Sequence, residues 1–236
     1  MLGKELTLLI RSGIDTRENG NYIDGEKILK QSFQEALISK QTDLILESAN
    51  QLSIQYRLLA GRFNRQGKID QARAYAEASL DIYQTIQKNN LFNDSDPGLM
   101  RNLGHAVLYA GKIEEAIPIL RKSHQIQTNL ASKGDESCHL AAALIENGDL
   151  QEAKKLLEEG LNLILNNDGS KIWLTFGLMT KATLLTKQGK ILDAKRILDE
   201  ADLIAQQNNL AVRQEEIEYL MSKISPEIGV LQTVGV

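Results

Sequence analysis

The sequence predicts an all-α protein, a right-handed α-solenoid of antiparallel helix pairs, and three observations support this prediction. The chain of 236 residues contains three prolines and 5% aromatic residues, a composition that favours helices. A short phrase, a glycine followed by an apolar and acidic stretch, recurs five times at intervals of 37 to 47 residues. Amphipathic segments precede and follow each of these glycines, so each repeat predicts two helices joined by a tight turn.

The repeats align on five glycines, which we call the anchor glycines. They are Gly20, Gly67, Gly111, Gly148 and Gly189. Glycine adopts the left-handed backbone conformation that ends many helices. We therefore expect each anchor glycine to end the first helix of its pair.

Small side chains recur at three fixed distances from the anchor glycine, and they predict how the helices pack. They are Gly13, Ala60, Gly104, Ala141 and Ala182 seven residues before it, Gly25, Ala72, Ala116, Ala153 and Ala194 five after it, and Ser32, Ser79, Ser123, Gly160 and Ala201 twelve after it. Four of the five repeats also place a leucine nine residues after the glycine. Small residues at fixed positions let two helices approach closely while larger neighbours fill the grooves.

Turn and cap signals give the boundaries of the elements in order. Asp96 before Pro97 is a helix N-cap followed by proline at the first helical position. The segments 132–135 and 166–171 indicate turns, and Ser225-Pro226 should end the last helix. Within one domain, residues 1–225, we expect hairpins at about 3–40, 42–88, 96–131, 134–166 and 169–207, a capping helix at about 209–224, and then a C-terminal tail at 226–236.

The pattern of apolar and small residues resembles that of the tetratricopeptide repeat (TPR) family. The first helices carry Leu103-Gly104-Val107 and Leu140-Ala141-Leu144, and the second helix of the third repeat carries Ala116, Leu120 and Ser123. The resemblance extends over about the whole chain, although the period exceeds the 34 residues typical of the family. It implies the fold and, as for solenoids in general, a surface that binds other proteins.

Composition and charge exclude several function classes. The formal net charge is −4, so no overall basic field attracts nucleic acid or an anionic membrane. The single cysteine, Cys138, excludes an intramolecular disulfide and is consistent with a reducing compartment. The N-terminal segment is too short and too charged for a secretory signal. We expect a cytoplasmic protein that binds neither nucleic acid nor a membrane.

Motifs of catalysis and metal binding are missing from the sequence. It contains no phosphate-binding glycine loop and no metal-ligand spacing of histidine and cysteine. Cys138 and His139 could face His105 across neighbouring first helices and form a metal or thiol site. The simpler interpretation is a small apolar cysteine beside two polar residues. We therefore predict a protein that is not an enzyme, with no catalytic residues, no metal and no cofactor.

The first helices of the repeats should line a concave groove. Residues three, six, nine or ten before each anchor glycine lie on one stripe of these helices. The candidate partner-binding residues are Arg57, Asn64, Arg101, Asn102, His105, Tyr109, His139 and Thr183. Arg57 and Arg101 occupy equivalent positions in adjacent repeats, and arginine binds carboxylates through two parallel hydrogen bonds. They match only in part the carboxylate-binding set of chaperone cofactors in the family, and ordinary solvated polar residues are the alternative interpretation.

The predicted function is a non-catalytic scaffold or adaptor that binds a peptide or helix of another protein, for example an acidic or C-terminal segment, in its groove. The alternative is a peptide-sensing regulatory module that acts on a separate output protein. A homo-oligomeric structural protein also stays open, and the molecular mass in solution would test it. Recognition of RNA, in which each helical repeat would bind one base, is disfavoured because the repeat length varies and the sequence has no basic stripe.

Overall fold

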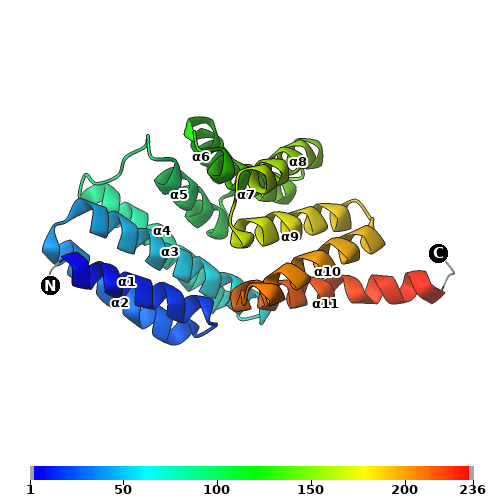
Figure 1. The fold of residues 1–236 in the computed structure, drawn as a ribbon, viewed down its shortest axis with the longest axis horizontal. Helices are drawn as coiled ribbons and strands as arrows, with labels where there is room; N and C mark the ends of the chain where they lie inside the picture. Colours follow the sequence, from blue (N-terminus) through cyan, green and yellow to red (C-terminus); the bar gives the residue numbers. More distant parts are fainter. Residues whose placement is uncertain (1–2, 234–236) are drawn as a thin grey trace. The chain divides into compact units, whose positions relative to one another are not determined.

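The computed structural model describes the backbone of residues 3–233 and the side chains of residues 3–226, and every regular element within it is an α-helix (Figure 1). The chain divides into two compact units whose boundary lies between Ser123 and His124. We call them the N-terminal unit and the C-terminal unit. The predicted all-α helical-repeat solenoid fold is confirmed. No helix in the described part of the chain is both long and apolar enough to cross a membrane.

The N-terminal unit is built from two helix pairs and the start of a third. Its helices are α1 (Gly3–Glu18), α2 (Tyr22–Ser39), α3 (Thr42–Arg65), α4 (Ile69–Lys88), α5 (Pro97–Tyr109) and α6 (Ile113–Ile126), the last of which continues across the boundary. The pairs α1–α2 and α3–α4 form side-by-side hairpins, and α3 also contacts α1, α2 and α5. The long helix α3 is therefore the central element of this unit.

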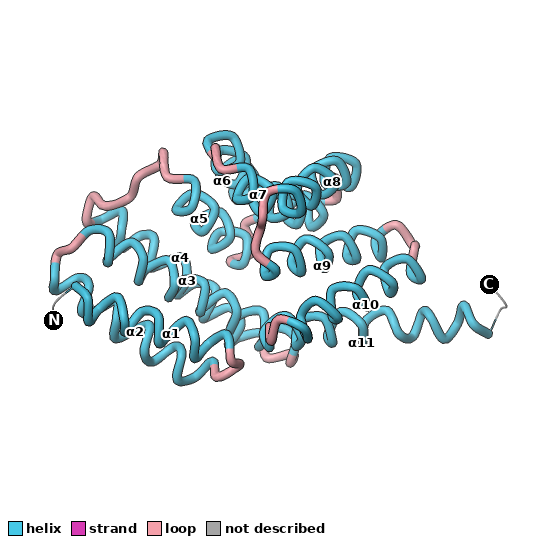
Figure 2. Tube along the Cα trace, in the orientation of Figure 1, coloured by secondary structure: helices cyan, strands magenta, loops and turns pink. Residues whose placement is uncertain are grey.

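The C-terminal unit contains two further helix pairs and a last helix. Its helices are α7 (Leu130–Asn147), α8 (Leu150–Asn166), α9 (Lys171–Lys187), α10 (Ile191–Gln207) and α11 (Ala211–Thr233). The pairs are α7–α8 and α9–α10, α9 also contacts α7 and α8, and α11 packs against α9 and α10. The helices of each pair are joined by short turns, which are drawn in pink in Figure 2.

The anchor glycines have the predicted conformation. All five have positive φ, from +73° at Gly67 and Gly189 to +92° at Gly148. Each lies just after the first helix of its pair, and the backbone N–H of Gly148 donates to the carbonyl of Ile145 at 3.2 Å. A residue with a Cβ is disfavoured in this region of φ and ψ, which explains why the glycine recurs.

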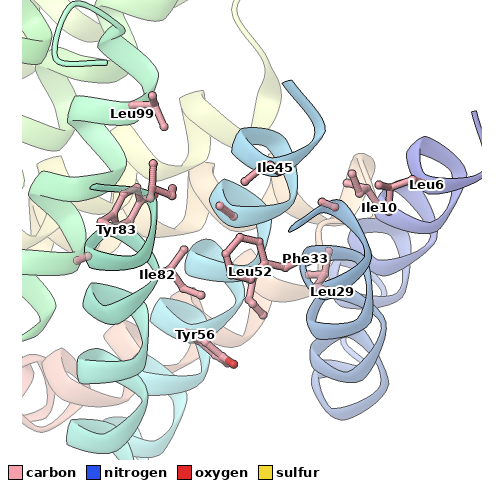
Figure 3. Packing of buried hydrophobic residues seen from close by; sticks show 14 residues of the cluster. Leu6, Ile10, Leu29, Phe33, Ile45, Leu52, Tyr56, Ile82, Tyr83 and Leu99 are labelled. Carbon is pink, nitrogen blue, oxygen red and sulfur yellow. The ribbon is translucent and has the colours of Figure 1, made fainter. Parts of the chain in front are cut away.

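The small residues pack as the repeat predicts. A Cβ built on Gly13 would come within 2.7 Å of the Leu29 side chain, and one built on Gly104 within 2.7 Å of the Leu120 side chain. In both hairpins the residue seven before the anchor glycine therefore receives the leucine nine after it. Figure 3 shows part of the hydrophobic core of the N-terminal unit, where Leu29, Leu52 and Tyr83 come from three different helices.

The turn predicted at 132–135 is wrong, because these residues lie inside α7. The helix begins earlier, where the side-chain oxygen of Asn129 accepts from the backbone N–H of Ser132 at 2.9 Å. Gly134 does not form a turn; it lies where α7 packs against α8. A Cβ there would come within 2.6 Å of the Gly160 carbonyl oxygen on α8, so the glycine permits close contact between the two helices.

The predicted end of the last helix at Ser225-Pro226 is also wrong. Helix α11 continues through Pro226 to Thr233, so residues 226–233 of the predicted tail are helical and residues 234–236 lie outside the described part. Proline removes one backbone donor from a helix and disfavours it without always ending it. The Ser225 hydroxyl donates to the Met221 carbonyl at 2.7 Å in this turn. That the chain forms one domain over 1–225 stays a prediction.

Candidate functional site

Most of the predicted binding residues lie on two helices of the N-terminal unit that contact each other. Arg57 and Asn64 lie on α3, and Arg101, Asn102, His105 and Tyr109 lie on α5. These six residues do not share one environment. Asn64 and Tyr109 are exposed, Arg57 and Arg101 are half-buried, and Asn102 and His105 are buried. Arg57 and Arg101 are thus close enough to interact, and Arg57 contacts the buried Asn102.

A chain of hydrogen bonds joins Arg57 to the interior of the N-terminal unit. The Arg57 Nη2 group donates to Asn102 Oδ1 at 3.1 Å. The Asn102 side-chain amide in turn donates to Asn50 Oδ1 at 3.3 Å. The Tyr83 hydroxyl donates to the same Asn50 oxygen at 3.1 Å. Helices α3, α4 and α5 each contribute to this polar chain, so the packing of three helices determines where Arg57 lies.

The charge of Arg57 is only partly compensated. The pKa of Arg57 is lowered to about 10, chiefly by burial; Tyr83 and Tyr109 act in the opposite direction, and the positive charges of Arg101 and Arg17 contribute to the lowering. Among the described residues no carboxylate pairs with Arg57, and its Nε is buried without a hydrogen-bond partner. A cation held out of water without a counter-charge is costly, so this guanidinium favours an anion.

Tyr109 borders the same region from α5. Its side chain is 43% exposed. A Cβ built on Gly61 of α3 would lie 3.7 Å from Tyr109 Cε1, so the ring lies beside this part of α3. An exposed aromatic ring next to a half-buried arginine is a common composition of protein-binding surfaces.

Sequence reasoning missed Arg17, Asn50 and Tyr83. Arg17 on α1 is 4% exposed and contacts Glu18 Oε1 at 2.9 Å, and its Nη1 donates to the Gln51 side chain at 3.2 Å. Asn50 lies seven residues, about two helical turns, before Arg57 and therefore on the same side of α3. That spacing was a usable signal. No signal in the sequence pointed to Tyr83, because only the packing of α4 against α3 brings its hydroxyl to Asn50.

The remaining predicted residues, His139 and Thr183, lie in the C-terminal unit, on α7 and α9. His139 Nε2 is 3.3 Å from Asp135 Oδ1, and its ring centroid is 4.1 Å from that of Phe176. The Thr183 hydroxyl donates to the Met179 carbonyl within its own helix at 3.0 Å.

The residues that could carry metal or thiol chemistry do not form such a site. Within the described residues, no three His, Cys, Asp or Glu side chains come together in a way that could hold a metal ion. Burial, and then the negative charge of Asp135, raise the pKa of the Cys138 thiol far above its usual range. A thiol that stays protonated is a poor nucleophile.

No protein-family model and no curated protein matches the chain. Solved structures do match it. A TPR protein from Thermus thermophilus, TTC0263, superimposes with a TM-score of 0.57 at 15% identity, over 90% of this chain and 98% of that one. A variant of the nearly identical TPR-like repeats of a Podosopora anserina kinesin light chain has a TM-score of 0.51 at 18% identity, over 87% and 96%.

This chain has a TPR-like fold. A third TPR-like match is a Rap protein complexed with Competence and Sporulation Factor, with a TM-score of 0.55 at 11% identity. The match covers 96% of this chain and 65% of the Rap protein. At these identities the similarity concerns the fold. The Arg57 site has to be argued from its own geometry.

Proposed function

We propose that this TPR-like chain is a non-catalytic scaffold or adaptor that binds an acidic peptide or helix of another protein at Arg57. The observation that carries the proposal is the half-buried Arg57 guanidinium, which no carboxylate of the described residues neutralises. A carboxylate of a partner would replace the missing counter-charge through charge-assisted hydrogen bonds. Helical-repeat folds supply extended surfaces for such contacts.

The predicted binding residues take different parts in this proposal. Arg57, Arg101 and the exposed Tyr109 are the proposed contacts, and Asn64 on α3 extends them. His105 is 4% exposed and is proposed to support the surface. His139 and Thr183 are proposed as separate contacts in the C-terminal unit. A cytoplasmic location stays a prediction from the sequence.

A peptide-sensing regulatory module that acts on a separate output protein is the second candidate. The TPR-like match to a Rap protein complexed with Competence and Sporulation Factor supports it. Both candidates require a bound partner and differ in whether binding changes the protein's effect on a third molecule. A homo-oligomer, the third possibility, is tested by molecular mass in solution.

Site-directed photo-crosslinking tests the proposal. A photo-reactive amino acid replaces Tyr109, and an exposed position on α10, Leu203 (55% exposed), serves as the control position. Captured proteins from the source cell are digested, and the crosslinked peptide is sequenced. Each capture is repeated in Arg57→Gln and in Arg73→Gln, a matched loss of charge at an exposed arginine on α4.

We expect a crosslink from position 109 to an acidic segment, weakened by Arg57→Gln and unchanged by Arg73→Gln. Equal capture by all variants, or crosslinks from position 203 alone, would reject Arg57 as the binding site. A crosslink to a second copy of this chain would favour the homo-oligomer.

A further inference from the structure

Arg57 is held in place by side chains that a partner cannot reach. Tyr83 is 0% exposed and Asn102 is 4% exposed, so a bound peptide cannot contact the Tyr83 hydroxyl. The single side-chain amide of Asn102 already makes hydrogen bonds through both of its polar atoms: the oxygen accepts from Arg57 and the nitrogen donates to Asn50. The sequence pattern made Asn102 a candidate contact, whereas its bonds indicate a supporting role.

The direction of each hydrogen bond in the polar chain follows from the chemistry of the groups. Arginine can only donate, so the Asn102 oxygen must face Arg57. The Asn102 nitrogen must then face Asn50, whose oxygen accepts from both Asn102 and the Tyr83 hydroxyl. Reversing either amide would place two donors or two acceptors against each other. The chain therefore permits one arrangement, and that arrangement directs an acceptor at Arg57.

All the partners in this chain are uncharged. An aspartate at position 102 would neutralise Arg57, whereas an asparagine holds the guanidinium and leaves its charge in place. Arg101 and Arg17 contribute to the lowered pKa of Arg57, although Arg17 is itself paired with Glu18. The result is a positioned cation with an unmatched charge.

We infer that Asn50, Tyr83 and Asn102 are positioning residues that hold Arg57 in one orientation for a carboxylate of a partner. This inference rests on the proposed function and deepens it, because it names the bound group and the side chains that prepare its site. A fixed guanidinium loses less conformational entropy when it binds a planar carboxylate than a mobile one does. The positioning residues thereby raise affinity without touching the ligand.

The first test concerns orientation and uses the side-chain ¹H–¹⁵N spectrum of the full chain. The Arg57 signals are assigned by their loss in Arg57→Lys. A guanidinium held through one Nη group rotates slowly and gives separate Nη proton signals. Tyr83→Phe removes the hydroxyl at the base of the polar chain. Tyr75→Phe is the matched control, because Tyr75 lies on the same helix and its hydroxyl donates to Glu26 Oε2 at 2.9 Å instead of to the polar chain.

We expect separate Arg57 signals in the wild type and in Tyr75→Phe, and merged signals in Tyr83→Phe. Thermal unfolding of both variants shows that each is folded at the temperature of the spectra. Identical Arg57 signals in the two tyrosine variants would overturn the positioning role. Loss of a general packing contact would affect both variants, whereas loss of positioning affects Tyr83→Phe alone.

The second test concerns the bound group and uses sodium acetate as the probe, at constant ionic strength with sodium chloride. The Arg57 Nε–H shift reports binding. We expect Tyr83→Phe to weaken acetate binding by about fivefold, in the range of one neutral hydrogen bond. Asn102→Asp should weaken it by at least about tenfold, because it supplies an internal counter-charge. That variant keeps an acceptor for Arg57 but loses the donor to Asn50, so it tests the loss of charge, and Tyr83→Phe alone tests positioning.

The outcomes distinguish this inference from the proposed function. Ordered Arg57 signals with no response of the wild type to acetate would overturn the carboxylate assignment and count against the proposed function, while the role of Tyr83 in orientation would stand. A response to inorganic phosphate at the same ionic strength, with none to acetate, would replace carboxylate by phosphate. Crosslinking at position 109 without any effect of Tyr83→Phe on acetate binding would uphold the proposed function and reject the positioning residues.

Discussion

The tenth residue before the anchor glycine differs between two adjacent pairs of repeats, one pair in each unit of the molecule. In the second and third repeats, in the N-terminal unit, it is Arg57 on α3 and Arg101 on α5. In the C-terminal unit it is Cys138 on α7 and Met179 on α9. Arg57 is half-buried in a polar chain, and Cys138 and Met179 are 0% and 8% exposed. One register position is therefore ionic in the first pair and apolar core in the second.

The neighbours of this position explain the difference. Around Cys138 the adjacent helices present glycines, because a Cβ on Gly160 or Gly177 would come within 3.0 Å or 2.9 Å of the Cys138 sulfur. Around Arg57 the adjacent helix α5 presents the amide of Asn102, which is in turn bonded to Asn50 of α3. Helices in close contact through glycines leave room for a thiol only, whereas polar neighbours accommodate a guanidinium. The comparison teaches that the repeat determines where a residue lies, and the neighbouring helices determine what it can be.

The largest expected effect comes from giving the C-terminal unit the residue of the N-terminal unit. Cys138→Arg should lower the free energy of unfolding by about 3–5 kcal/mol, because it places a charged and much longer side chain in a closed interface. Arg57→Met, the exchange in the other direction, should cost less, about 1–3 kcal/mol, since it abandons no buried counter-ion but leaves the buried Asn102 oxygen without its donor. Urea unfolding measures both. A folded Cys138→Arg with unchanged stability would break the comparison.

The next effect concerns two helical glycines, one in each unit. Gly134→Ala should destabilise by about 1–3 kcal/mol, because the new methyl group would overlap the Gly160 backbone oxygen of α8. Gly61→Ala meets the end of the Arg65 side chain at 3.3 Å and makes only ordinary contacts otherwise. It should stabilise by up to about 1 kcal/mol through helix propensity. Thermal unfolding of the pair measures the difference, and equal effects would mean that α7 and α8 do not pack through their backbones.

Helix caps give a smaller effect that can be located in one unit. The Asp96 carboxylate accepts from the Leu99 backbone N–H at 3.0 Å at the start of α5, and Asn129 caps α7 in the same way. Asp96→Ala should lower the free energy of unfolding by about 1 kcal/mol. Asp96→Asn keeps an N-cap acceptor and should lower it by only about a few tenths of a kcal/mol. Hydrogen exchange should show faster opening near α5 for Asp96→Ala and near α7 for Asn129→Ala. The same protection pattern in both variants would show that the two units open as one.

The smallest effect is that of Tyr83→Phe on stability, about 0.5–1 kcal/mol for one buried hydrogen bond. Its pH dependence is more informative. Burial raises the pKa of Tyr83 to about 12 from its ordinary value of 10, so the folded state keeps this proton over a range where the unfolded state releases it. The contribution of Tyr83 is therefore complete below about pH 10 and declines as the pH rises towards about 12. Unfolding of wild type and Tyr83→Phe at about pH 8 and about pH 11 should show the difference between them shrinking, and a growing difference would contradict the burial of the hydroxyl.

Much of the fold could be predicted because it depends on local patterns. The anchor glycines marked the turns, and the small residues marked the contacts within each helix pair, as Gly104 and Leu120 show. The start of α7 could not be predicted in this way. Gly134 carries the same local signal whether it ends a helix or lies in a close helix contact, and only the position of α8 decides between the two.

The candidate site could be predicted only in part, for a similar reason. Spacing placed Arg57 and Arg101 on one stripe, and it could have added Asn50. It could not show that Asn102 is buried at 4% exposure, nor that Tyr83 reaches Asn50 from a different helix. Exposure and hydrogen bonding between helices depend on the packing of three helices at once, and a stripe on one helix contains no such information.

The sequence by itself determined the repeat, the helix pairs and the residues that share a stripe on the first helices, because glycine conformation and helical period act within a few residues of each other. Tertiary structure alone decided that Arg57 is a half-buried, hydrogen-bonded cation while Cys138, at the same place in its repeat, is an inert core residue. The physical reason is that burial and counter-charge are properties of the space between helices. That space is formed by side chains far apart in the sequence.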